Sequence, residues 1–192
     1  MKLVYFITHP NVVIDPDIPV PDWPLSEKGF ARMEAFLANP LVESIAAVYC
    51  SAERKAIDGA QVIAAHLSLD IIVDKQLGEN DRSSTGFLPP DEFEVMANRF
   101  FAAPTESVEG WERAIDAQDR IAAAIRKIAN EDVSDGNIAI VAHGGVGALA
   151  LCRFSNYPID RKYDQPQNGG GNYFCFRADS MEMVHGWKPI DP

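Results

Sequence analysis

The sequence has few of the features that bind a polyanion or span a membrane. Only 17 basic residues stand against 28 acidic ones, and the formal net charge of −11 opposes binding to the phosphates of nucleic acids or anionic lipids. No apolar run is long enough for a membrane span, and the amino-terminal run is too short for the core of a signal peptide. We therefore expect a cytoplasmic protein with neither nucleic acid nor membrane as a partner.

Cysteine is also scarce, and its pattern argues against two kinds of site. Cys50, Cys152 and Cys175 are odd in number, widely spaced and set in apolar sequence. This pattern is typical of reduced core thiols in a reducing compartment rather than of a disulfide framework or a zinc site. The histidines form no close His-x-His or His-x-x-x-His pair either, so we expect no metal site.

Apolar, β-rich runs alternate with amphipathic segments along the 192 residues. Strands are predicted at residues 3–7, 45–50, 69–73, 137–142 and 171–177, with a last strand-like segment at 181–187. Helices are predicted at about residues 26–37, 51–67, 91–101 and 111–128. The alternation predicts right-handed crossovers, and hence one three-layer α/β/α sandwich over residues 1–192 with a mostly parallel sheet.

Two segments depart from this alternation. Residues 80–110 are rich in Pro, Ser and Gly, and we expect an insertion near the mouth of the ligand crevice. The run Asn168-Gly169-Gly170-Gly171-Asn172 lacks the spacing and the following helix of a nucleotide-phosphate loop, so it indicates a flexible connection.

Two histidines close predicted strands almost the whole chain apart. His9 follows the strand at residues 3–7, and His143 follows the strand at 137–142. The carboxyl ends of parallel strands meet at the ligand crevice, so both imidazoles are expected in one pocket. His66 and His185 lie in a helical pattern and in the last strand-like segment, where a structural or exposed role is the simpler interpretation.

A second cluster of polar residues begins where the strand at residues 45–50 ends. Ser51 is expected to cap the following helix, whose first turn then carries Arg54 and Lys55. Cations are mildly unfavourable at a helix start, whereas free N–H groups there attract anions. The cluster therefore indicates a phosphate site, with ordinary surface charge as the alternative.

Five motifs follow one another in the order of a known family: a strand ending in His9, then Pro24-Leu25-Ser26-Glu27-Lys28-Gly29, Val48-Tyr49-Cys50-Ser51-Ala52-Glu53-Arg54-Lys55-Ala56, Leu77-Gly78-Glu79 and Val141-Ala142-His143-Gly144-Gly145-Val146. The chain resembles the histidine phosphatase superfamily, the phosphoglycerate mutase-like proteins. The resemblance implies that fold, no cofactor, and a phosphohistidine on His9. It also implies that His143 stabilises the transferred group and that Glu79, rather than the nearby Asp81 or Glu92, protonates the leaving group.

The resemblance also implies phosphate contacts, but two residues of the first histidine motif differ from those of the family. Its usual Arg-His-Gly is here Thr8-His9-Pro10, which lacks a guanidinium and a backbone N–H. Thr8 and Gly144 flank the two histidines and are expected at the phosphate. The second arginine of the family falls on Lys55, with Arg54 one position earlier and about 100° away on a helix, so either could face the phosphate. Arg82 could supply the missing positive charge.

These residues lead to the prediction of a phosphatase that acts on a small phosphorylated metabolite, such as a sugar or nucleoside-like monophosphate, or on a phosphoprotein. The alternative is a phosphate-binding pseudoenzyme that lost turnover with the changes at Thr8 and Pro10. Phosphoglycerate mutase activity fits less well, because the sequence lacks a long basic set for a multiply charged ligand. The sequence gives no indication of the oligomeric state.

Overall fold

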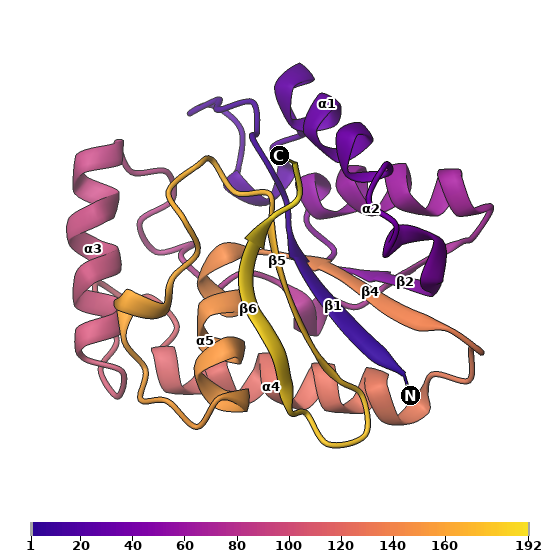
Figure 1. Cartoon of the computed structure of the whole chain (residues 1–192). Coiled ribbons are helices and arrows are strands. Elements are labelled where there is room, and N and C mark those ends of the chain that lie inside the picture. Colours follow the sequence, from indigo (N-terminus) through magenta and orange to yellow (C-terminus); the bar gives the residue numbers. More distant parts are fainter. Residues whose placement is uncertain (1, 192) are drawn as a thin grey trace.

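A six-stranded sheet forms the middle layer of the protein in the computed structural model, which describes residues 2–191 (Figure 1). Across the sheet the strands are β3 (Ile71–Val73), β2 (Ile45–Cys50), β4 (Asn137–Ala142), β1 (Leu3–Thr8), β5 (Asn172–Arg177) and β6 (Met183–Pro189). The first four are mutually parallel, whereas β5 runs antiparallel to both β1 and β6. The predicted mostly parallel sheet is confirmed.

Helices cover both faces of the sheet and complete the predicted three layers. One face carries α1 (Glu27–Phe36) and α2 (Arg54–Leu67), and the other carries α3 (Pro90–Ala102), α4 (Ala114–Glu131) and α5 (Gly144–Phe154) (Figure 1). Successive side chains of a strand point to opposite faces. Tyr5 and Ile7 of β1 accordingly join the core under α1 and α2, while Val4 and Phe6 join the core under α4 and α5. No helix within residues 2–191 is long and apolar enough to cross a membrane.

The start of α2 differs from the prediction. Ser51 still donates its backbone N–H to Val141 O (3.0 Å), so the chain is extended there and continues the sheet. The helix begins only at Arg54, with Glu53 at the N-cap position. Ser51 therefore does not cap α2, and its hydroxyl is available to the residues at the carboxyl end of β4.

The glycine run before β5 is an ordered turn rather than a flexible connection. Gly169, Gly170 and Gly171 all have φ between 68° and 83°, a region that side chains strongly disfavour. A Cβ on Gly170 would lie 2.2 Å from His9 O, and the N–H of Gly171 donates to the same oxygen (3.1 Å). Only glycine allows this approach, and the turn holds the backbone of His9 in place.

Candidate active site

The register between β1 and β4 brings His9 and His143 together. Thr8 pairs with Ala142, and the N–H of His9 continues the ladder by donating to Ala142 O (3.0 Å). The next residue of each strand is a histidine, and the two ring centroids lie 5.2 Å apart with an interplanar angle of 67°. The structure therefore places both imidazoles at one point of the carboxyl edge.

His9 is held with one ring nitrogen free. Its Nδ1 lies 2.9 Å from Pro10 O, and because a carbonyl only accepts, Nδ1 carries the proton. Nε2 then keeps its lone pair. Burial and then the charge of Lys55 lower the pKa of His9 to about 4, so the ring is neutral at pH 7. Proline removes an N–H at position 10 but keeps the carbonyl that orients the ring.

His143 is fully buried and contacts two residues of the segment after β2. Its Nε2 lies 2.8 Å from Ser51 Oγ and 3.3 Å from Glu53 Oε1. Burial lowers the pKa of His143 to about 4, although the Glu53 carboxylate opposes the shift. Its Nδ1 and Asn80 Nδ2 are the buried side-chain polar atoms within residues 2–191 that have no hydrogen-bond partner. Such atoms are uncommon, and a ligand oxygen would satisfy them.

Glu53 is a site residue that the sequence analysis did not single out. Its Oε1 accepts the N–H of Glu79 (2.9 Å), and its Oε2 is paired with Lys55. Burial alone would raise the pKa of the Glu53 carboxyl, but His143, Lys55 and that N–H outweigh it and lower the pKa to about 2. Glu53, at the start of α2, therefore contacts both His143 and the loop that carries Glu79.

Glu79 lies across the amino-terminal end of α5. Its Oε2 accepts the N–H of Gly145 (3.0 Å), and its Oε1 accepts the N–H groups of Val146 (2.9 Å) and Asn80 (3.0 Å). The loop itself is fixed by Arg120 of α4, which donates to three of its carbonyls, those of Gln76 (2.8 Å), Gly78 (2.9 Å) and Glu79 (3.2 Å). The carboxyl is therefore rigidly placed beside the histidine pair.

This placement of Glu79 depends on Gly145, which gives a first testable prediction. A Cβ at position 145 would lie 2.7 Å from Glu79 Oε1, so Gly145→Ala must displace the carboxyl. A displacement of about 1 Å can cost about 100-fold in rate. We expect kcat/KM to fall between about 10- and 100-fold for a reaction catalysed at this site. Gly186→Ala is the control, since a Cβ there meets nothing within 4 Å, and equal losses in both variants would contradict the expectation.

The two cationic side chains at the start of α2 point in different directions. Lys55 is buried, and its Nζ donates to Val20 O (2.9 Å) and pairs with Glu53. The side chain of Arg54 is 61% exposed and forms an ion pair with Asp58 (2.7 Å). Of the two alternatives left open by the spacing, Lys55 is the one whose charge reaches His9 and His143.

Arg82 lies near His9. It lines the same cavity as His9, and its charge contributes to the lowered pKa of that residue. The guanidinium lies over the rings of Phe93 (5.0 Å to the centroid) and Trp111 (5.7 Å). It has no carboxylate partner within residues 2–191, which leaves its N–H donors available to an oxyanion.

Thr8 and Gly144 hold the loop before β5. The Thr8 hydroxyl donates to Gln165 Oε1 (2.7 Å) and accepts the N–H of Asn172 (3.0 Å), so it is engaged away from the cavity, contrary to the expected phosphate contact. Gly144 lines the cavity, and a Cβ there would lie 2.2 Å from Gln165 Nε2. Its side-chain position is thus filled by Gln165, and only its backbone is open to a ligand.

The cavity next to His9, hereafter the His9 cavity, has a volume of about 180 Å³. One wall is polar and includes Glu79, Asn80 and Gly145. Apolar side chains line another part of it: Phe93, Ala97, Phe100 and Phe101 come from the segment predicted as an insertion, and Trp111 directly follows that segment. Asp81 and Glu92, the alternatives to Glu79, do not line it.

Asp164 is a second carboxyl on this cavity. It lies in the loop between α5 and β5, and its Oδ1 accepts the N–H of Gln165 (2.7 Å). Burial raises the pKa of Asp164 to about 6, and Glu79 and Glu94 add to the shift while Arg161 opposes it. Asp164 therefore carries its proton over much of the mildly acidic range.

The shifted pKa values of His9, His143 and Asp164 predict how stability depends on pH. His9 and His143 take up protons at about pH 6.5 when unfolded but only at about pH 4 when folded, so stability falls as the pH drops through this window. Asp164 acts in the opposite sense between about pH 6 and its unfolded value of 3.8. The net loss from pH 7 to pH 5 is on the order of 2 kcal/mol.

Urea unfolding at the two pH values measures this loss, and two variants separate its parts. His143→Asn should remove most of the loss, whereas Asp164→Asn should enlarge it because the opposing group is gone. A wild-type stability that stays level or rises between pH 7 and pH 5 would show that the two imidazoles are not held neutral.

Comparison with known proteins identifies the family. The sequence profile of the "Histidine phosphatase superfamily (branch 1)" matches residues 18–185. The chain therefore belongs to the histidine phosphatase superfamily, in agreement with the resemblance of its motifs. No curated protein matches the sequence.

Solved structures show the same fold at low sequence identity. YhfR of Bacillus stearothermophilus is 24% identical with a TM-score of 0.79, and the match covers 100% of this chain and 98% of that one. A mycobacterial glucosyl-3-phosphoglycerate phosphatase is 17% identical, with a TM-score of 0.77 and coverage of 98% and 96%. A putative alpha-ribazole-5'-P phosphatase from Escherichia coli str. K-12 is 15% identical, with a TM-score of 0.76 and coverage of 100% and 98%. The fold is thus phosphoglycerate mutase-like, and its neighbours include phosphatases.

Proposed function

We propose that the protein is a phosphomonoesterase that acts through a phosphohistidine on His9. The observation that carries the proposal is that neutral His9 keeps Nε2 free while its ring lies close to the buried ring of His143. The two ring centroids are 5.2 Å apart. A neutral imidazole is a good nucleophile near pH 7, and a covalent intermediate replaces one difficult displacement by two easier ones.

In the first step, the lone pair of His9 Nε2 attacks phosphorus, and the bond from phosphorus to the leaving oxygen breaks. That oxygen takes a proton from Glu79. Glu79 Oε1 already accepts two N–H groups, whereas Oε2 accepts only one and keeps a lone-pair position for this proton. In the second step, water attacks phosphorus, the phosphorus–nitrogen bond breaks, and the proton of the water returns to Glu79.

Charge on the transferring phosphoryl group needs preorganised donors. Lys55 and Arg82 supply positive charge near His9, and Nδ1 of His143 and Nδ2 of Asn80 are donors that have no protein partner. Ser51 can give its hydroxyl proton to Nε2 of His143, which leaves Nδ1 as the N–H that faces an oxyanion. These four groups take the place of the guanidinium that Thr8 lacks.

A small substrate fits better than a folded phosphoprotein. The His9 cavity holds about 180 Å³, well below the 300–1,000 Å³ or so of sites for drug-sized ligands. Two of the structural neighbours are named as phosphatases of small phosphate esters. The alternative is a protein that binds phosphate without turnover, and it rests on the replacement of Arg-His-Gly by Thr8-His9-Pro10.

The test is to trap the intermediate. The protein is mixed with acetyl phosphate or p-nitrophenyl phosphate, quenched in alkali and digested, and the peptide with His9 is searched by mass spectrometry for a phosphoryl adduct that is lost in acid. We expect the adduct on His9 together with steady release of inorganic phosphate. Binding of phosphate without adduct or turnover would establish the non-catalytic alternative instead.

A further inference from the structure

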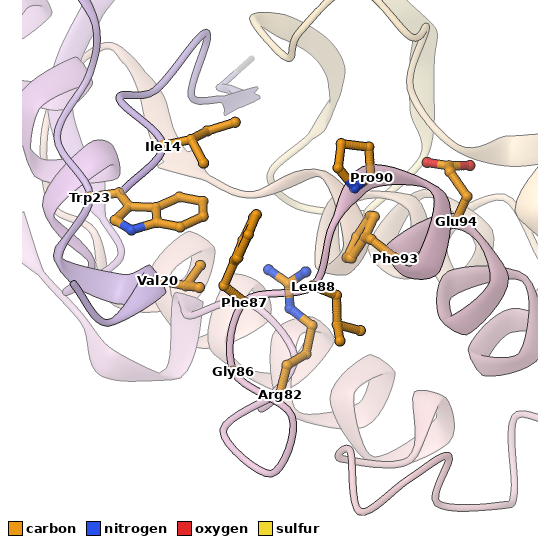
Figure 2. A pocket seen from close by; sticks show the side chains of 10 residues that line it. All are labelled: Ile14, Val20, Trp23, Arg82, Gly86, Phe87, Leu88, Pro90, Phe93 and Glu94. Carbon is orange, nitrogen blue, oxygen red and sulfur yellow. The ribbon is translucent and has the colours of Figure 1, made fainter. Parts of the chain in front are cut away.

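A second hollow, here called the aromatic hollow, shares lining residues with the His9 cavity. Figure 2 shows the side chains that line it. Its volume is about 260 Å³. Its apolar lining includes Ile14, Val20, Trp23, Phe87, Leu88 and Phe93. These side chains come from two stretches far apart in the sequence, the Pro-rich segment before α1 and the segment around the start of α3. Neither belongs to the motifs that define the family.

The aromatic rings of Trp23 and Phe87 line the hollow. The rings of Trp23 and Phe87 lie 5.6 Å apart at an angle of 60°. The indole N–H of Trp23 donates to Asp15 O (2.8 Å) and Ile18 O (3.0 Å), so its polar edge is satisfied within its own loop. An apolar group entering the hollow therefore meets no unsatisfied donor from this ring.

The charged groups of the hollow are arranged asymmetrically. Glu94 is paired with Arg161 (2.7 Å), and Figure 2 shows its carboxylate at the outer edge, beyond Phe93. Arg82 occupies the middle, with Trp23 and Phe87 on one side and Phe93 on the other (Figure 2). The hollow thus offers one available cation among apolar walls, which excludes a leaving group that carries several charges.

Arg82 and Phe93 line both the aromatic hollow and the His9 cavity. The two spaces therefore adjoin at the guanidinium. An ester bound with its phosphoryl group near His9 and Arg82 would extend its organic part past Arg82 into the hollow. Because Arg82 already lies over Phe93 (5.0 Å), its remaining N–H donors can bind the phosphoryl oxygens without leaving the rings.

We propose that the aromatic hollow binds the leaving group, and that the substrates are phosphate monoesters whose alcohol carries one uncharged, flat apolar ring system. This inference rests on the proposed phosphatase function and specifies its substrate class. Burying one phenyl group supports a preference of about 10- to 100-fold over a polar alcohol of similar size.

The experiment compares 2-phenylethyl phosphate with glycerol 3-phosphate, which are both esters of primary alcohols and so have similar leaving oxygens. We expect kcat/KM to be at least about 10-fold higher for the phenylethyl ester. Phe87→Ser should lower this ratio by about 10-fold, whereas Phe87→Leu should retain most of it. Ile14→Ser, in the other segment that lines the hollow and at an exposed position, should lower the ratio by about 3-fold.

Val133→Ser is the matched control, because Val133 is 94% exposed and lies outside both spaces. It should leave the ratio unchanged, and circular dichroism should show each variant folded. Acetyl phosphate separates the two levels of the proposal, since its small leaving group does not need the hollow. Turnover of acetyl phosphate with a ratio near one, or with a ratio that Phe87→Ser leaves unchanged, would overturn the leaving-group site alone. If none of the three compounds is hydrolysed, the proposed phosphatase function itself is overturned.

Discussion

Replacing His9 by asparagine is expected to lower turnover by at least about 10⁴-fold and to remove the phosphoryl adduct altogether. Asparagine keeps a polar side chain of modest size but has no lone pair on nitrogen that can attack phosphorus. The loss should appear in kcat, because the nucleophile acts in the chemical step that follows substrate binding. Steady-state kinetics and the alkali-quenched mass spectrum measure the two effects.

His66→Asn is the control for this result. His66 lies in α2 and pairs with Glu43 (2.9 Å), away from the His9 cavity, so its loss should leave both turnover and adduct unchanged. His143→Asn should fall between the two, with a loss of about 100- to 1,000-fold, because it removes a donor to the transferring group but not the nucleophile. An adduct that persists in His9→Asn would place the nucleophile elsewhere.

The sheet and the histidine pair were predictable because their signals are local. Continuous apolar runs mark strands covered on both faces, and a histidine directly after each of two such runs must meet the other if the strands are adjacent. The structure has Thr8 opposite Ala142, which is the register that the prediction needed. The sequence could not predict that register, but it could predict that both histidines lie at the carboxyl edge of the sheet.

Helix α5 was not predicted from the sequence, because its first turn is rich in glycine. Gly144, Gly145 and Gly147 lower helix propensity, so the segment after His143 does not have a helical composition. The structure explains all three by contact, since a Cβ on Gly144 would meet Gln165. A Cβ on Gly145 would strike Glu79, and one on Gly147 would lie 2.8 Å from the ring of Phe6. Long-range packing of this kind has no local signal.

Glu53 was missed for the same reason. It lies within the motif that begins at Ser51, yet a lone carboxylate at a helix start has an ordinary structural interpretation, since it favours the helix dipole. Only the folded chain brings it to His143 and to the N–H of Glu79. The Ser51 hydroxyl also found its partner, His143, only through the sheet.

Lys55→Met should lower kcat/KM by about 100- to 1,000-fold, as large a loss as that expected for His143→Asn. Lys55 is the buried cation of the site, and its charge is felt by both His9 and His143. Without it, the Glu53 carboxylate remains as an unopposed negative charge beside the incoming phosphate. Lys55→Arg keeps the charge and should retain activity within about 10-fold.

Two further variants distinguish a lost phosphate contact from a damaged fold. Arg54→Met removes a cation one position earlier, but that side chain is largely exposed and pairs with Asp58, so kcat/KM should change by less than about 3-fold. The double variant Glu53→Gln with Lys55→Met leaves no unpaired buried charge, so its thermal midpoint should recover relative to Lys55→Met. Its activity should stay low, because the positive charge near His9 and His143 is still missing. Recovery of activity together with stability would mean that Lys55 serves only to neutralise Glu53.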